Sequence, residues 1–258
     1  MYSRIRAALA SPNRKKKIFD YFYADLLYAL PVSARRRIFA GEAHFCPICD
    51  SHVRKFLNLH RAYHLYCPVC RSLQRFRFVW LFLASQHMQM GQKPERMLHI
   101  APETALTARF LQVPDLDYLS ADLYSPAAMV KMDVSSIQYP DASFDIIYCS
   151  HVLEHVPDDR QALKEFYRVL RPQGRLVLLV PILSPITIED PSITSPEERE
   201  RVYGQHDHVR SYGPDIEERV WQAGFETHIY TTSNLANPEQ AECMALGYEE
   251  VIYYCQKD

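Results

Sequence analysis

Two pairs of cysteines with the same internal spacing constrain the fold of this chain most strongly. Cys46-Pro-Ile-Cys49 and Cys67-Pro-Val-Cys70 are separated by 17 residues. Each pair can supply two thiolates from one tight turn, and four thiolates complete the tetrahedron that Zn²⁺ prefers. A segment of roughly 30 residues cannot build an adequate core alone, so the metal would supply folding energy. The sequence therefore predicts a structural zinc ion in a module over residues 41–72, bound by these four cysteines.

Alternatives to this zinc site are few. Redox chemistry explains two matched pairs less well than a metal does. His44, His60 and His64 lie close enough in the sequence to compete as ligands, but four cysteines already suffice. Asp50 and Arg71 stand where a glycine often follows the second cysteine of such a turn, which leaves the geometry of the two turns open.

Charge divides the chain into two parts of opposite sign. Residues 1–90 carry 15 Lys and Arg against 4 Asp and Glu, whereas residues 91–258 carry 14 against 27. This asymmetry predicts two domains, the first of which faces an anionic partner such as RNA. Basic residues interleaved with aromatic ones around the cysteines can pair with phosphates and stack on bases. A solvated ribbon whose aromatic residues pack on the neighbouring domain remains an equal alternative.

The first 40 residues combine basic clusters with a stretch, residues 18–30, whose apolar positions recur at helical spacing. We expect a helix packed on the body of the protein rather than an arm that touches phosphates or lipid. No apolar run reaches the roughly 18–20 residues of a membrane span, and the start lacks a signal peptide's apolar core. We therefore expect a cytoplasmic protein, in which seven cysteines favour metal binding or free thiols over disulfides.

Strands and helices alternate from Arg96 onward. This alternation predicts an α/β fold with a doubly wound, parallel sheet, so the expected domains are a helical N-terminal segment (1–40), the zinc module (41–72) and an α/β domain (73–258). The expected strands cover residues 97–101, 118–121, 144–150, 175–181, 225–231 and 250–255, and the expected helices cover 73–86, 104–111, 158–170 and 214–223.

Four stretches of the α/β domain occur in a characteristic order. They are M-L-H-I-A-P-E (97–103), Y-L-S-A-D-L (118–123), M-D-V-S-S-I-Q-Y-P-D-A-S-F-D-I-I-Y-C-S-H-V-L-E-H-V (132–156) and F-Y-R-V-L-R-P-Q-G-R-L-V-L (166–178). In order and spacing they resemble the class I S-adenosylmethionine-dependent methyltransferases, in particular the broad type 11 group. The resemblance covers roughly residue 96 to residue 258. It implies a seven-stranded, mostly parallel Rossmann-like sheet, S-adenosyl-L-methionine as the cofactor, and methyl transfer as the activity.

The resemblance also implies which residues meet the cofactor. Doubly wound folds bind ligands beyond the carboxyl ends of their strands. In this family an acidic residue at the end of the second strand accepts the ribose hydroxyls, a later Asp-Val pair meets the adenine, and the end of the fourth strand lies beside the reactive methyl. The residues assigned in this way are Asp122 and Leu123 for the ribose side, Asp133 and Val134 for the adenine, and Ser150 and His151 beside the methyl.

The first motif departs from the family pattern. An acidic residue followed by a glycine-rich turn is usual, but this chain has His99-Ile-Ala101-Pro102-Glu103 without any glycine. Glycine lets the backbone approach the methionine part of the cofactor, and Ala101 is small enough to keep that approach, whereas Pro102 removes a donor. A zinc-ribbon-bearing subgroup has the same H-x-A-P-E turn, which implies that Glu103 faces the cofactor's ammonium group and that His99 does the work of the acidic residue.

A loop rich in histidine follows the strand expected at 175–181. Its sequence, Y-G-Q-H-D-H-V-R-S-Y-G (203–213), lies where class I enzymes build the acceptor side of the pocket. His206 and His208 are candidate general bases, and Arg210 is a candidate for holding a carboxylate or phosphate. A His-x-His metal pair and a purely structural loop are the alternatives.

Two functions of different classes remain. The first is methyl transfer to an unidentified acceptor, either RNA or a small anionic or glycan hydroxyl or amine. Because a sulfonium methyl is already activated, such an enzyme chiefly aligns the reactants and excludes water. No N/D-P-P-Y/F motif follows the fourth strand, which disfavours methylation of exocyclic amines on bases. The alternative is a non-catalytic zinc-ribbon protein that binds nucleic acid and carries a degenerate cofactor domain.

Overall fold

The computed structural model describes residues 23–58, 65–85, 88, 90, 93–247 and 250–258. The chain divides into two compact units, of which the first comprises residues 1–88 with 232–248 and the second comprises 89–231 with 249–258. The units thus differ from the expected ranges, because the helix after the cysteines and the segment 232–248 group with the first unit. Residues 23–29 are helical, and the rest of the helix expected at 18–30 lies largely outside the described residues.

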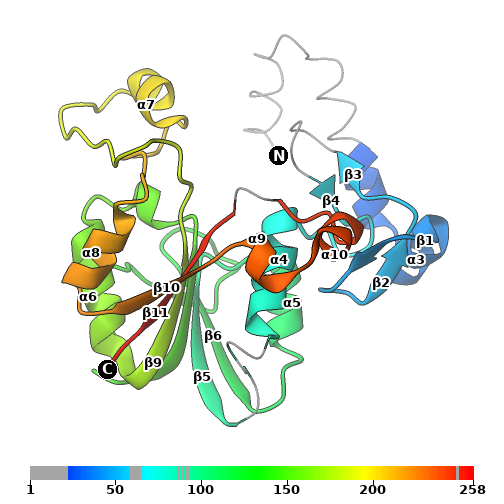
Figure 1. Ribbon diagram of the computed structural model, residues 1–258, viewed down its shortest axis with the longest axis horizontal. Coiled ribbons are helices and arrows are strands. Elements are labelled where there is room, and N and C mark those ends of the chain that lie inside the picture. Colours follow the sequence, from blue (N-terminus) through cyan, green and yellow to red (C-terminus); the bar gives the residue numbers. More distant parts are fainter. Residues whose placement is uncertain (1–22, 59–64, 86–87, 89, 91–92, 248–249) are drawn as a thin grey trace. The chain divides into compact units, whose positions relative to one another are not determined.

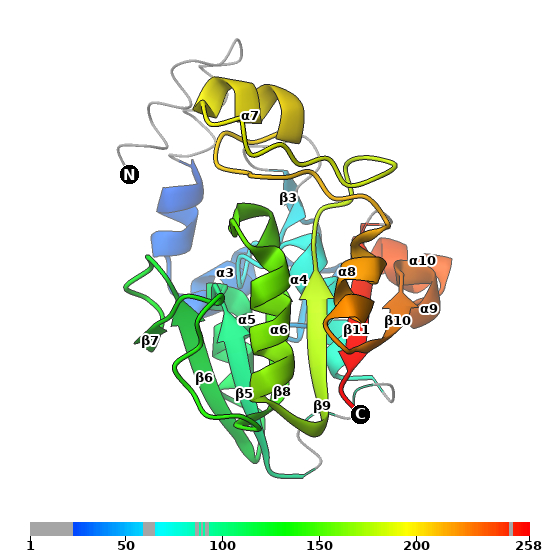
Figure 2. The same cartoon turned by 90° about the vertical axis from the view of Figure 1, so that its left-hand side faces the viewer.

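A seven-stranded sheet lies in the second unit (Figure 1), and its strand order β10-β11-β9-β8-β5-β6-β7 can be followed in Figure 2. Neighbours from β9 through β7 run parallel, whereas β11 is antiparallel to both β9 and β10. The doubly wound, mostly parallel sheet expected from the sequence is therefore confirmed. The strands are β5 (Glu95–Ile100), β6 (Leu116–Asp122), β7 (Val130–Lys131), β8 (Phe144–Ser150), β9 (Leu170–Leu179), β10 (Glu226–Tyr230) and β11 (Ile252–Gln256).

Helices cover both faces of this sheet. Figures 1 and 2 show α6 (Asp159–Val169) and α8 (Ile216–Gln222) on one face and α5 (Thr104–Phe110) on the other. Because both faces are covered, β5 and β8 are almost continuously buried, and five of the seven residues of β8 are apolar. α6 begins after Asp158, whose side chain accepts a hydrogen bond from the Gln161 backbone, and it buries an apolar stripe at helical spacing against the sheet.

The strand order reverses direction between β5 and β8. From β5 the chain continues to β6 on one side, whereas β8 and β9 follow on the other side. Figure 2 shows the arrowheads of β6 and β9 pointing toward the same end of the sheet. Loops at this end diverge on either side of the reversal, which opens a crevice where doubly wound folds bind ligands.

Among the described residues, three α-helices lie outside every segment expected to be helical, although the start signals of two of them are present in the sequence. They are α7 (Pro196–Tyr203), α9 (Thr232–Leu235) and α10 (Pro238–Cys243). Ser195 caps α7 by accepting the backbone N–H of Glu198, and Asn237 forms a reciprocal capping box with Gln240 at the start of α10. Both helices have proline in the first turn, where its missing N–H costs nothing.

Short elements build the first unit. β1 pairs with β2 and β3 pairs with β4, both antiparallel. Arg77 on α4 is fully buried and donates to the carbonyls of Ser72, Met244 and Ala245, which joins this helix to the chain after α10. The remaining elements are α3 (Val32–Phe39), β1 (Ala40–Cys46), β2 (Ser51–Val53), β3 (Leu57–Asn58), β4 (Leu65–Tyr66) and α4 (Gln74–Leu83). Among all helices described, none combines the length and the apolar character needed to cross a bilayer.

Candidate metal centre and candidate active site

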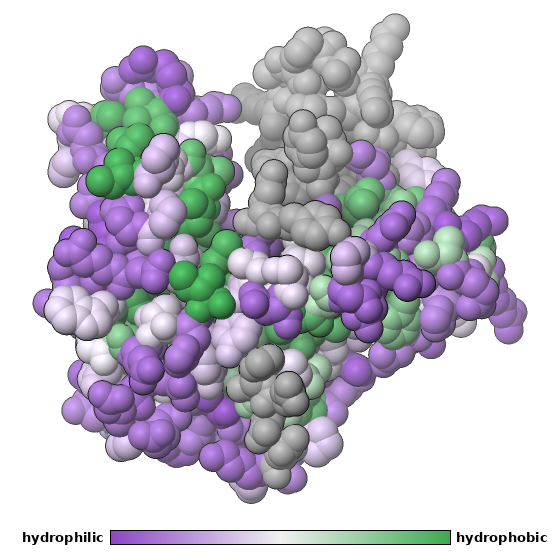
Figure 3. All heavy atoms as spheres, viewed as in Figure 1, coloured by the Kyte–Doolittle hydropathy of each residue, from purple (hydrophilic) through white to green (hydrophobic). Residues whose placement is uncertain are grey.

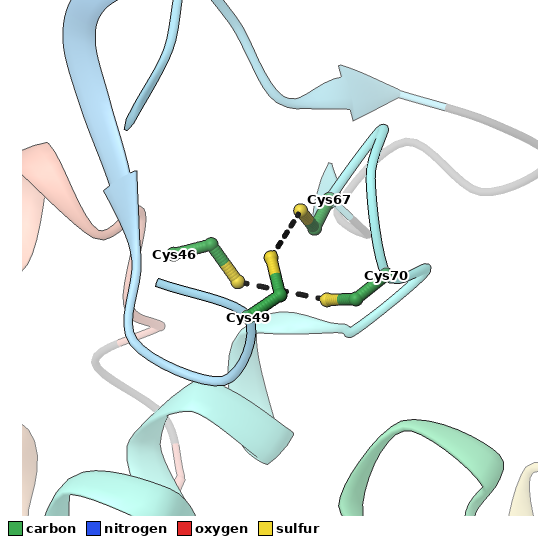
Figure 4. A group of neighbouring side chains, drawn as sticks. All are labelled: Cys46, Cys49, Cys67 and Cys70. Atoms are coloured by element: carbon green, nitrogen blue, oxygen red, sulfur yellow. Dashed lines mark hydrogen bonds between the residues drawn. The ribbon is translucent and has the colours of Figure 1, made fainter. Parts of the chain in front are cut away.

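The four predicted cysteines converge on one point in the first unit (Figure 4). The sulfur of Cys46 lies 3.7 Å from that of Cys70, and the sulfur of Cys49 lies 3.8 Å from that of Cys67. A tetrahedral zinc ion with Zn–S bonds near 2.3 Å holds its sulfurs about 3.8 Å apart. The cluster therefore fits a zinc ion bound by four thiolates without rearrangement.

The backbone around the cluster has the form that two metal-binding turns require. Asp50 and Arg71, each directly after a second cysteine, adopt the left-handed conformation with φ of 50° and 67°. The turns thus form without the usual glycine. The backbone N–H of Val69 points at the Cys67 sulfur at 3.4 Å. His44 approaches the carbonyl of Cys243 instead of the cluster, while residues 60 and 64 lie outside the described part of the chain.

Negative charge is shared unevenly among the four thiols. Hydrogen bonds from the other three thiols hold the pKa of Cys46 well below its usual value. The hydrogen bonds that Cys67 and Cys70 make to Cys46 raise the pKa of both. Four adjacent thiols cannot all ionise without a cation between them, and a metal ion supplies that charge.

A pocket of about 600 Å³ opens at the carboxyl ends of β5, β6 and β8, which is the size of ordinary cofactor sites. All of its lining residues belong to the second unit. Six of the nine residues predicted to bind the cofactor line it, namely Ala101, Asp122, Leu123, Asp133, Val134 and His151. The other residues that line the pocket were not predicted from the sequence to bind the cofactor. They are Ile100, Tyr124, Met132, Ser135, Val152, His155, Val156, Pro157, Asp158 and Asp207.

Asp122 ends β6 with an oriented carboxylate. Its Oδ1 accepts the backbone N–H groups of Tyr124 at 2.7 Å and Ser125 at 2.6 Å. These bonds fix the carboxylate at the pocket wall and leave Oδ2 for another donor. In the next loop, Asp133 Oδ1 accepts both the N–H and the hydroxyl of Ser135. Both acidic residues are therefore held by local turns at the positions that the resemblance implies.

The glycine-free first motif keeps a glycine-like backbone. Ala101 adopts a left-handed conformation with φ of 52° at the end of β5. His99 does not line the pocket, because its ring is fully buried between the hydroxyl of Tyr118 at 2.8 Å and the carboxylate of Glu103 at 2.7 Å. Tyr148 also donates to Glu103. The hydrogen bond between His99 and Glu103 thus stabilises the turn at Ala101. Neither His99 nor Glu103 is among the residues that line the pocket.

The end of β8 carries unusual polar groups. Ser150 is buried and is not among the residues that line the pocket. No described residue provides a hydrogen-bond partner for its hydroxyl. His151, which lines the pocket, has a φ of 55° and places its Nδ1 3.4 Å from Glu154 and its Nε2 3.8 Å from Glu250. The ring is therefore held between two carboxylates.

The structure engages the guanidinium of Arg210 within the fold. Its side chain is 4% exposed and donates to Glu189 and to three backbone carbonyls, those of Leu153, Val156 and Pro157. This geometry corrects the expectation that Arg210 holds a substrate anion, because the donors of its guanidinium are already engaged within the fold.

The two predicted histidines lie beside the pocket without lining it. His206 is 67% exposed, and its Nδ1 lies 4.0 Å from Asp207. His208 is buried, and burial lowers the pKa of its ring. Between them in the sequence, Asp207 does line the pocket, and its Oδ2 lies 3.4 Å from Nδ1 of His155. The general-base role of either predicted histidine stays a prediction.

Comparisons with known proteins agree with this geometry. A family model described as "Methyltransferase domain" matches residues 96–178. The 27-O-demethylrifamycin SV methyltransferase of Amycolatopsis mediterranei is 40% identical over 58 residues, which are 22% of this chain and 21% of that protein. The ubiquinone/menaquinone biosynthesis C-methyltransferase UbiE of Pectobacterium carotovorum is 30% identical over 125 residues, 47% of this chain and 49% of that protein. The chain thus spans no more than about half of these relatives.

Solved structures share the fold. A putative sarcosine dimethylglycine methyltransferase from Galdieria sulphuraria superimposes with a TM-score of 0.51 at 13% identity, over 76% of this chain and 91% of that one. The strand order, the pocket at the carboxyl ends and the matched family model agree with one another. Residues 96–178 therefore match the methyltransferase-domain family, the sheet has the Rossmann-like fold of the class I methyltransferases, and a four-cysteine cluster lies N-terminal to the matched segment.

Proposed function

We propose that this protein transfers a methyl group from S-adenosylmethionine to a hydroxyl or amine of a small acceptor. One observation carries the proposal. A single pocket wall presents the oriented carboxylate of Asp122, the Asp133–Val134 turn and the left-handed turn at Ala101, while His151, His155 and Asp207 form another part of the lining. The wall with Asp122 suits a nucleoside, and the part with histidines suits an acceptor that must lose a proton.

Each part of the pocket has a defined task. The cofactor supplies an already activated methyl group, so the chain need only bind, align and exclude water. Asp122 accepts the ribose hydroxyls with the oxygen left free by the backbone, and Val134 contributes apolar contact to the adenine. Ala101 allows the backbone to come close to the amino-acid part. Asp207, which lines the pocket, can hold the acceptor and take its proton.

A small, partly apolar acceptor has the best support. Beyond the carboxyl end of β9, Leu183, Ile186 and Ile188 are 59%, 64% and 43% exposed, and apolar side chains gather on this part of the surface beneath α7 (Figure 3). The two curated relatives are named for a rifamycin derivative and for quinone biosynthesis. Such apolar surface favours a partly apolar molecule over a glycan.

RNA has less support as the acceptor. Two basic residues of the first unit form hydrogen bonds with the cysteine turns. Arg35 donates to the carbonyl of Val69, and Arg36 donates to the carbonyl of Cys49. The guanidinium of Arg71 lies over the ring of Tyr28. These groups stabilise the metal module itself, which reduces the basic surface available to phosphates.

A labelled-methyl transfer assay tests the proposal. Purified protein is incubated with S-adenosylmethionine labelled at the methyl group and with cell extract separated into RNA, protein, lipid and small-molecule fractions. We expect label in the small-molecule or lipid fraction, and loss of that label with Asp122→Ala. Label in the RNA fraction would contradict the proposed small acceptor. Equal labelling by the wild type and by Asp122→Ala would contradict the proposed cofactor site.

A further inference from the structure

Three side chains at the pocket form a second cluster of residue types that can ligate a metal ion. Glu154 and His155 lie on the short helix η1 (Leu153–His155) after β8, and His208 lies in the loop after α7. One ligand atom from each of the three lies within 4.8 Å of the others. The two segments are tied together, since the N–H of Val209 donates to the carbonyl of Glu154 at 2.9 Å. The cluster is separate from the four cysteines and belongs to the second unit.

The carboxylate of Glu154 is buried without full compensation. Its side chain is 2% exposed, and no described residue donates a hydrogen bond to its Oε2. The other oxygen, Oε1, lies 3.4 Å from Nδ1 of His151. Buried carboxylates are normally paired, hydrogen-bonded or bound to a metal, because an uncompensated buried charge is costly. A buried carboxylate with an unpartnered oxygen, in a cluster with two imidazoles, therefore suits a bound cation.

Both histidines have the outer contacts of metal ligands. Nδ1 of His208 lies 3.2 Å from the carbonyl of Tyr203, so this nitrogen donates and Nε2 carries the lone pair. Nδ1 of His155 lies 3.4 Å from Asp207, whose second oxygen is held by Gln205 at 2.8 Å. In metal sites the ligating histidine commonly donates its other N–H to a backbone carbonyl or a carboxylate, which fixes the tautomer and the ring orientation.

We propose that Glu154, His155 and His208 bind a divalent transition-metal ion, with Zn²⁺ as the best match. Two imidazoles and one carboxylate are a donor set that zinc accepts, and three protein ligands leave a fourth position open. Bonds near 2.1 Å place tetrahedral ligands about 3.4 Å apart, and the three ligand atoms already lie within 4.8 Å of one another. Because His155 lines the pocket, the open position faces the acceptor side.

Titration of the protein with Co²⁺ tests this site, while the zinc of the cysteine cluster is left in place. We expect one further equivalent to bind near neutral pH. Its visible absorption should be that of cobalt bound by nitrogen and oxygen, without the intense near-ultraviolet band of cobalt bound by thiolates. If the wild-type protein takes up no further cobalt at 100-fold excess, the proposal is wrong. The three side chains would then share a proton instead of a metal ion.

Variants locate the bound ion. Asp207→Asn removes an outer contact of a ligand and should weaken cobalt binding by roughly 10–100-fold. Glu154→Gln and His208→Ala each remove a ligand and should weaken cobalt binding by more than this. His206→Ala is the matched control, because it removes an exposed histidine from the same loop. Equal weakening by His206→Ala, or full binding by Glu154→Gln, would contradict the assignment. If either buried variant fails to fold, the wild-type titration still decides, and it requires no methyl transfer.

Discussion

Asp159 is a buried carboxylate that lies between two guanidinium groups. Arg219 donates to it at 2.8 Å, Arg210 Nε lies 3.6 Å away, and the hydroxyl of Tyr212 donates to it at 2.6 Å. Glu189 contacts both arginines from the more exposed side. This network connects the start of α6 to α8 and to the histidine-rich loop. It explains why an arginine that resembles a substrate ligand in the sequence is a structural residue in the fold.

Replacement of Arg210 should therefore affect folding first. Arg210→Ala removes one of the two arginine donors to Glu189 and the guanidinium donor to three carbonyls, and breaking such a buried pair costs about 3 kcal/mol. Denaturant unfolding followed by circular dichroism measures the change. His206→Ala, in the same loop but exposed, should change the free energy of unfolding by less than about 0.5 kcal/mol. Equal effects of the two substitutions would show that the network contributes little.

Glu189 makes this network sensitive to acid. Although its burial opposes the shift, hydrogen bonds from Arg210 and Arg219 hold the pKa of Glu189 below its ordinary value near 4.5. A lowered pKa in the folded state means that the contribution to stability is present above pH 4.5 and is lost as the pH falls through the lower, folded-state value. Glu189→Gln should flatten the loss of stability below pH 4.5, measured by thermal melting. An unchanged profile would place the acid sensitivity elsewhere.

Ala101 carries backbone strain at the pocket. The left-handed conformation costs a non-glycine residue about 1–2 kcal/mol, and the entropy cost of glycine offsets part of that. Ala101→Gly should therefore raise the free energy of unfolding by about 0.5–1 kcal/mol and preserve cofactor binding. Ala127, an exposed loop residue that is not in this conformation, provides the control, since Ala127→Gly should not stabilise the protein. A loss of stability with Ala101→Gly would contradict the strained turn.

At the scale of elements, the two cysteine turns depend on a metal ion for their geometry. Both turns have a left-handed residue after the second cysteine, and the strands that flank them are only two to seven residues long. Elements this short cannot fold independently, so the bound ion is expected to supply much of the stability of the module.

The purified protein should therefore hold one zinc ion tightly in this cluster after gel filtration in metal-free buffer. Cys46→Ser should lose that ion, because a hydroxyl cannot replace the buried thiolate as a soft ligand. Cys243→Ser, which changes a cysteine outside the cluster, should keep it. Elemental analysis measures the content. A Cys46→Ser protein with undiminished tightly held zinc would exclude the four-cysteine assignment.

Elements with strong local signals were predictable from the sequence. The run 144–150 is β8 as expected, and the Asp158 cap and apolar stripe define α6. α7 and α10 were missed because their polar sequences lack a clear apolar period, although Ser195 and Asn237 mark their starts. Side-chain partners could not be predicted, since the carbonyl contacts of Arg210 and the His155–Asp207 pair join segments more than 50 residues apart.

At the scale of the whole molecule, the two candidate sites lie in different units. The cysteine cluster occupies residues 46–70 of the first unit, whereas the lining of the pocket lies within residues 100–207 of the second. The opposite charges of the two halves of the sequence follow this division. The fold and six residues of the pocket lining were therefore predictable from contiguous motifs, but the return of residues 232–248 to the first unit depends on contacts such as those of Arg77.

Titration calorimetry of the zinc-loaded protein with S-adenosylmethionine tests the central claim most directly. We predict that one equivalent binds, and that Asp122→Ala weakens binding by roughly 10- to 100-fold, because a charge-assisted hydrogen bond contributes about 1.5–3 kcal/mol. Asp117→Asn, on the same strand but outside the pocket, should leave the affinity unchanged. A folded, zinc-loaded protein that binds no S-adenosylmethionine at millimolar concentration would contradict the account.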